Sequence, residues 1–242
     1  KYMHQGMVVV LESSTYPAEF ATGTGGQISV ITKSGSNAYH GSIFEYLRNS
    51  ALDSRNFFDG SAKSPLRLNQ FGGSFGGPVK KDKLFFFLAN ETLRQRAFQN
   101  LVATVPSAAA KARAVPAIRP LLAGYPTGAP TSNPDLDLAR LAASVPMDEY
   151  FGSARVDYSI SDKLNAYVRY NRDQGYLQQP LDVSGSYSLV TAVPQNAVLG
   201  LQQILSPKII NETRLGFNGA KTRIAGYAPL IPGADTTGVA VS

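Results

Sequence analysis

Apolar and polar residues alternate with a period of two through much of the second half of the sequence. From Tyr150 to Ile160, one face would carry Ala154, Val156, Tyr158 and Ile160, and the other Ser153, Arg155, Asp157 and Ser159. After the polar triplet "SDK" the alternation resumes, with Leu164, Ala166, Val168 and Tyr170 opposite Asn165, Arg169, Asn171 and Asp173. A period of two is the pattern of a β-strand, and two such strands joined by a short polar turn predict a β-hairpin.

Two further hairpins follow the same pattern. One consists of "NAVLGLQQIL", "SPK" and "IINETRLGFNGAK", in which Thr213, Leu215 and Phe217 alternate with Glu212, Arg214 and Asn218. The other consists of "LNQFGGSFGGPV", "KKDK" and "LFFFLANETLRQ". Its first strand would carry Phe71, Phe75 and Val79 on one face, with Gly73 and Gly77 between them. Glycines inside strands indicate bends or a close approach of another backbone.

Long and short connections alternate between the expected strands. The long ones span residues 49–67, 96–147 and 176–192, and the tight turns span 80–83, 161–163 and 206–208. A transmembrane β-barrel has this organisation, with short periplasmic turns and long extracellular loops. A soluble sandwich or lipocalin-like barrel also alternates, with its apolar face inward. The 96–147 connection, unusually long for a compact soluble domain, favours the membrane barrel.

The amino-acid composition excludes several other classes of protein. The 242 residues include 12 Tyr, 12 Phe and 22 Gly, with 43% hydrophobic and 17% charged residues, which is too apolar for a disordered chain. No apolar run of transmembrane-helix length is present, and the chain has no Cys for disulfides or thiolate sites. The net charge of +6 comes from 23 Lys and Arg spread along the chain, so we expect no nucleic-acid partner.

Three segments carry a family resemblance: "AEFATGTGGQISVITKSGSN", "EYLRNSALDSRNFF" and "NQFGGSFGGPVKKDKLFFF". They resemble the plug-to-barrel junction of TonB-dependent outer-membrane receptors, and most closely the Oar-like branch, whose members carry a carboxypeptidase-regulatory-like domain ahead of the plug. The resemblance covers roughly the first 95 residues. It implies an all-β fold: a partial antiparallel transmembrane β-barrel of about seven strands with the C-terminal end of a plug domain.

The resemblance also implies a domain division and a function. Residues 1–37 would end the plug and residues 38–242 would begin the barrel, with 96–147 as a long extracellular loop. The chain would then be a fragment of a receptor in the outer membrane of a Gram-negative bacterium. That receptor would bind a large nutrient outside the cell and import it by energy-coupled plug movement. Its partners would be outer-membrane lipid, the nutrient and, through a missing N-terminal part, the TonB energy-coupling protein.

Finer expectations concern the first residues and the long loop. Residues 27–33 should pair with the Val8–Leu11 strand in a small plug sheet, and the run from Tyr39 with the strand that begins near Leu68. Gly23, Gly25 and Gly26 would permit tight packing in the plug. Within the loop, "AAAKARAVPAIRPLLAG" and "DLDLARLAAS" both indicate short helices.

No motif for catalysis, cofactor binding or metal binding is found, so we expect no enzyme. His4 and His40 are the only histidines, and neither has a Cys partner or an HxxxH-type partner. No nucleophile elbow or Ser-His pairing is present. Two other functions remain open: a structural or adhesive outer-membrane barrel without transport, and a soluble β-rich binding domain.

Overall fold

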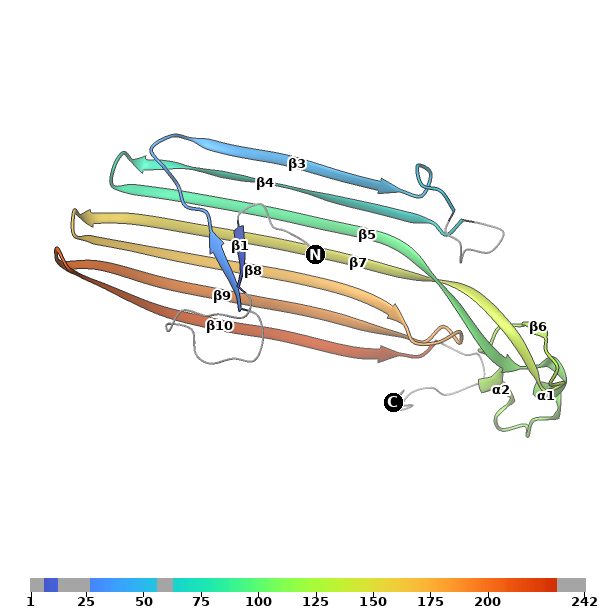
Figure 1. Ribbon diagram of the computed structural model, residues 1–242. Coiled ribbons are helices and arrows are strands. Elements are labelled where there is room, and N and C mark those ends of the chain that lie inside the picture. Colours follow the sequence, from blue (N-terminus) through green and yellow to red (C-terminus); the bar gives the residue numbers. More distant parts are fainter. Residues whose placement is uncertain (1–6, 13–26, 56–62, 230–242) are drawn as a thin grey trace.

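The computed structural model describes residues 7–12, 27–55 and 63–229. They form a small two-stranded sheet and a large antiparallel sheet (Figure 1). The small sheet pairs β1 (Met7–Glu12) with β2 (Gln27–Thr32). The large sheet contains β3 (His40–Asn49), β4 (Leu66–Lys80), β5 (Leu84–Pro106), β6 (Ala129–Pro130), β7 (Leu136–Ser161), β8 (Leu164–Pro180), β9 (Tyr187–Ser206) and β10 (Ile209–Tyr227). The expected all-β class is confirmed.

The large sheet is an open meander. Its order is β10-β9-β8-β7-β5-β4-β3, and the short β6 pairs with β7 off this path. The tight turns after β4, β7 and β9 all lie at one end of the sheet, on the left in Figure 1, and the long connections lie at the other. This confirms the alternation inferred from the sequence. Among the described residues, no helix is both long enough and apolar enough to span a membrane.

The expected separation of the first strands is also confirmed. Val9 pairs with Val30 inside the small sheet, whereas Ile43 pairs with Gly73 in the large one. The side-chain amide of Asn37 in the connector donates to the Asp82 carboxylate at 2.6 Å, and its oxygen accepts from the Asp82 backbone N–H at 2.8 Å. These bonds tie the connector to the β4–β5 turn. Gly23, Gly25 and Gly26 lie outside the described residues.

Strand register divides the large sheet into two faces. One row of paired positions crosses seven strands through Gly41, Phe75, Leu88, Ala154, Tyr170, Ala197 and Phe217. The next row towards the tight turns contains Phe86, Val156, Val168, Leu199 and Leu215. We call the face with these rows the outer face, and the face that carries Arg155 the inner face. Val156, Val168 and Leu215 remain 45%, 52% and 65% exposed, so this apolar face lacks cover from the described residues.

The tight turns step progressively along the sheet. Leu84 directly follows the β4–β5 turn, and the row of Leu84 reaches Tyr158 in β7 and Thr213 in β10. The β7–β8 turn lies beyond Tyr158, and the β9–β10 turn lies further still beyond Thr213. This stagger inclines the strands relative to the line of turns, as strand tilt in a closed barrel requires.

The long connection expected at 96–147 is shorter in the structure. β5 continues to Pro106 and β7 begins at Leu136, so the strands pair far beyond the rest of the sheet. The helix expected in "DLDLARLAAS" is wrong, because pairing with β5 outweighs the helix propensity of its Leu and Ala residues. The other expected helices form as α1 (Ala108–Arg113) and α2 (Arg119–Leu122). The 176–192 connection likewise shortens to residues 181–186.

A small core stabilises this extended hairpin. Val105 and Ala139 are fully buried from the two strands, and Val183 from the β8–β9 connection packs against them. Ser107 caps α1 by accepting from the Ala110 backbone N–H at 3.2 Å. We call residues 107–135 the cap.

Candidate functional site

The inner face concentrates polar groups near the middle of the sheet. Register places Arg155 opposite Arg169, Asp157 opposite Tyr167, and Ser153 opposite Asn171. The expected grouping of Arg155, Asp157, Arg169, Glu212 and Arg214 on one face, with Ala154, Val156, Tyr158, Val168, Leu215 and Phe217 on the other, follows from this register.

Arg155 is the centre of the inner-face contacts. Its Nε and Nη2 donate to both carboxylate oxygens of Asp157, at distances of 2.7 to 3.0 Å. Its guanidinium carbon lies 4.4 Å from the centroid of the Tyr167 ring. The side chains of Arg155 and Asp157 are only 17% and 22% exposed. A largely buried pair with three charge-assisted bonds holds the guanidinium in a fixed orientation.

The same guanidinium contacts the small sheet. Arg155 Nη1 donates to the Thr32 hydroxyl at 3.1 Å and to the Thr32 carbonyl at 3.4 Å. Thr32 ends β2 and is 7% exposed. Arg155 thus links β7 directly to the small sheet, although Arg155 and Thr32 are 123 positions apart in the sequence. We call Arg155, Asp157, Tyr167 and Thr32 the Arg155 clamp.

Tyr167 keeps its place because β9 has a glycine opposite it. Gly200 pairs with Tyr167, and a Cβ on Gly200 would overlap the tyrosine ring. The ring therefore lies flat over the bare backbone of β9 and presents its face to Arg155. Tyr167 and Gly200 were not singled out from the sequence, since their pairing depends on the register across the β8–β9 connection.

Amides surround a recess beside the clamp. Ser153 donates to Asn171 at 2.7 Å, Arg169 to Asn196 at 2.9 Å, and Asn196 to Asn218 at 2.5 Å. A cavity of about 440 Å³ lies here, lined in part by Phe151 and Asp173. One buried carboxylate oxygen of Asp173 has no hydrogen-bond partner among the described residues. The recess thus offers an acceptor and several amides.

The two histidines do not come together as a site. His4 lies outside the described residues, and His40 at the start of β3 contacts the Ala38 carbonyl at 3.0 Å. Within the part of the chain that the structure describes, no three His, Asp or Glu residues lie close enough to hold a metal ion.

An antiparallel sheet with an apolar outer face, a polar inner face, tight turns at one end and long connections at the other is the wall of a transmembrane β-barrel. Sequence comparison specifies the family. The outer membrane beta barrel domain matches residues 31–115 and 110–240, so the chain belongs to that family. The protein therefore resides in the outer membrane, and its apolar outer face meets lipid.

A curated relative gives a more specific but partial likeness. The chain is 39% identical over 80 residues to the TonB-dependent transporter Oar of Myxococcus xanthus. The match covers 30% of this chain and 7% of that transporter. No solved structure matches the chain.

Proposed function

We propose that this chain is part of a TonB-dependent receptor that binds a large nutrient outside the cell and imports it through the barrel. The likeness to the Oar transporter supports this proposal, and the Arg155 clamp is the observation that carries it. Residues 1–37 are the end of the plug in this proposal, and residues 38–242 are the first part of the barrel wall. The protein transports rather than catalyses.

The clamp suits a plug that must stay closed and yet move. Thr32 receives two hydrogen bonds from Arg155, and the guanidinium is already neutralised by Asp157. When the plug strand leaves, Arg155 keeps its carboxylate and its aromatic partner, so no charge is left unpaired. Such a contact holds the resting position and costs less to break than a buried ion pair, since both of its acceptors are neutral.

The partners follow from the same proposal. A TonB protein in the inner membrane would pull on a segment that precedes the plug, and the extracellular nutrient would enter past the cap. The amide-lined recess beside Asp173 lies on the inner face, where a passing solute would meet it.

Uptake from a complex medium tests the proposal without a known nutrient. Cells with and without the complete receptor, each with and without a functional TonB system, are fed isotope-labelled yeast extract, and their periplasmic contents are compared by mass spectrometry. We expect labelled compounds enriched only when receptor and TonB are both present. Identical periplasmic contents in cells with and without the receptor, when TonB is functional, would refute import and favour a structural barrel.

A further inference from the structure

Along the outer face, uncharged residues are followed by charged ones towards the long connections. Counted from the tight turns, its outward positions carry no charge as far as Asn69 in β4, Thr92 in β5, Tyr150 in β7, Tyr170 in β8 and Gly219 in β10. β9 carries no charged residue at all. In β4, β5, β7 and β10 this uncharged stretch matches the roughly 9 to 11 residues that a tilted strand needs to cross a membrane, and in β8 it is shorter. Short turns are periplasmic in this family's architecture, so the far edge of the band is the extracellular one.

Basic residues begin where the uncharged band ends. The outward positions there carry a set of exposed cations that we call the basic collar: Arg67 of β4, Arg94 and Arg96 of β5, Arg172 of β8, and Lys221 and Arg223 of β10. The neighbouring outward carboxylates are Glu45 and Asp148, and Asp148 pairs with Arg96 at 2.7 Å. Other carboxylates at these levels, Glu91, Glu149 and Asp173, face inward. The collar is therefore strongly positive on the side that faces lipid.

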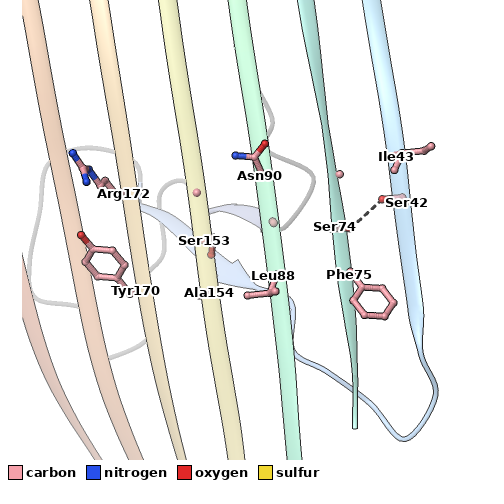
Figure 2. A pocket seen from close by; sticks show the side chains of 13 residues that line it. Ser42, Ile43, Ser74, Phe75, Leu88, Asn90, Ser153, Ala154, Tyr170 and Arg172 are labelled. Atoms are coloured by element: carbon pink, nitrogen blue, oxygen red, sulfur yellow. Dashed lines mark hydrogen bonds between the residues drawn. The ribbon is translucent and has the colours of Figure 1, made fainter. Parts of the chain in front are cut away.

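A groove lies directly below the collar. Figure 2 shows its wall, with Ile43 and Phe75 at one side, Tyr170 and Arg172 at the other, and Leu88 and Ala154 between them. Its volume is about 540 Å³. Gly152 forms part of its floor, and a Cβ there would meet nothing within 4 Å, so the space is open rather than filled by neighbours.

Aromatic rings mark the boundary between groove and collar. Arg94 lies 5.9 Å from the centroid of the Tyr150 ring, and the Tyr170 hydroxyl donates to Gln195 at 2.9 Å. Amphipathic rings of this kind gather at the level of lipid headgroups. The guanidinium of Arg172 bonds only weakly to Gln174, at 3.5 Å, which leaves its donors available to a stronger acceptor.

We propose that this surface binds one phosphorylated lipid of the outer leaflet. Its acyl chains occupy the groove of Figure 2, and Arg172 and Arg94 hold its phosphate groups. The positions of the collar and the groove indicate the outer leaflet. The cations lie on the extracellular side of the groove, and in the outer leaflet the headgroup of a lipid lies on the extracellular side of its acyl chains. Guanidinium and phosphate are matched in charge and in fork geometry. This inference rests on the membrane location and is independent of nutrient import.

Native mass spectrometry of the complete protein in mild detergent tests the proposal, with diphosphorylated lipid A as the probe. We expect the unaltered protein to retain this lipid at least about tenfold better than fully dephosphorylated lipid A with the same chains. The double variant Arg94→Gln, Arg172→Gln should lose that preference. Lys83→Gln, in a tight turn at the opposite rim, removes a charge without touching the collar and should keep it.

A separate variant tests whether the groove holds the acyl chains. Gly152→Leu fills the floor and should weaken retention of both lipids about equally, while heat-dependent migration on gels shows that the barrel is folded. Equal retention of phosphorylated and dephosphorylated lipid by the unaltered protein would overturn the proposal whatever the variants do. So would a loss in Lys83→Gln as large as in the double variant, or equally tight retention of phosphatidylglycerol, a phospholipid found in the inner leaflet.

Discussion

At the scale of single residues, the Arg155 clamp makes Thr32 inaccessible. Because the chain has no Cys, a single cysteine can report on this directly. We expect Thr32→Cys in the complete protein to react slowly with a small maleimide, and Ser34→Cys, two residues on and exposed, to react fast. Adding Arg155→Ala to Thr32→Cys should raise its labelling rate at least about tenfold. Equal rates with and without Arg155 would show that the clamp does not hold this strand.

Gly200 allows a second test at this scale. Gly200→Val must displace the Tyr167 ring from β9, so we expect it to destabilise the barrel by about 1 to 3 kcal/mol, as overpacking does. Gly216→Val is the matched control, because Gly216 also lies on the inner face and a Cβ there meets nothing within 4 Å. Urea unfolding in lipid vesicles measures both. A loss of the same size at Gly216 would mean that the ring contact is not the cause.

At the scale of one strand, β7 separates the two faces of the wall. Val156→Arg places a charge on the lipid face, which costs roughly 2 to 4 kcal/mol near the membrane midplane. Arg155→Val removes a charge from the polar face and leaves Asp157 without its ion pair. We expect Val156→Arg to reduce the folded fraction more, as judged by heat-dependent migration on gels. Equal heat stability of the two variants would contradict this orientation.

The extended hairpin of β5 and β7 supports a second prediction at the element scale. Val105→Asp puts an unpaired carboxylate into the small core and should unfold the cap, whereas Val102→Asp, at a position 54% exposed, should not. Trypsin added to intact cells should then cleave after Lys111 and Arg113 much faster in the Val105 variant. Resistance equal to that of the Val102 variant would show that the core does not hold the cap.

How much the sequence could predict differs between these elements. The faces of β7 and β8 were predictable, because a period of two survives in almost every residue between Tyr150 and Asp173. The strand at 136–144 was not, since its Leu and Ala residues favour a helix until β5 pairs with them. The contact of Arg155 with Thr32 could not be predicted either, because it joins two sheets whose relative position does not follow from the periodicity of either strand. The polar residues of the inner face were thus grouped correctly, whereas their partner in the small sheet, Thr32, was missed.

At the scale of the whole molecule, the wall is open. β3 and β10 are the edges of the large sheet, and each pairs with a strand on one side only among the described residues. Unpaired backbone groups cannot be left in hydrocarbon, so both edges need neighbouring strands in the membrane. We expect residues 1–242 produced alone in detergent to associate and to lack heat-dependent migration, and the complete protein to show it as a single species. A folded monomer of this chain alone would contradict the need for further strands.

The length of β7 bears on what happens at the cell surface. Its 26 residues, at about 3.4 Å each and inclined by 35 to 45°, reach a height of roughly 60 to 70 Å, against about 25 Å for the hydrocarbon band. More than half of the strand therefore extends beyond the hydrocarbon band, and the cap lies at the far end of the strand. A bulky particle that diffuses towards the cell therefore meets the cap before it reaches the mouth of the barrel. The distance between the cap and the mouth of the barrel is comparable to the thickness of the membrane.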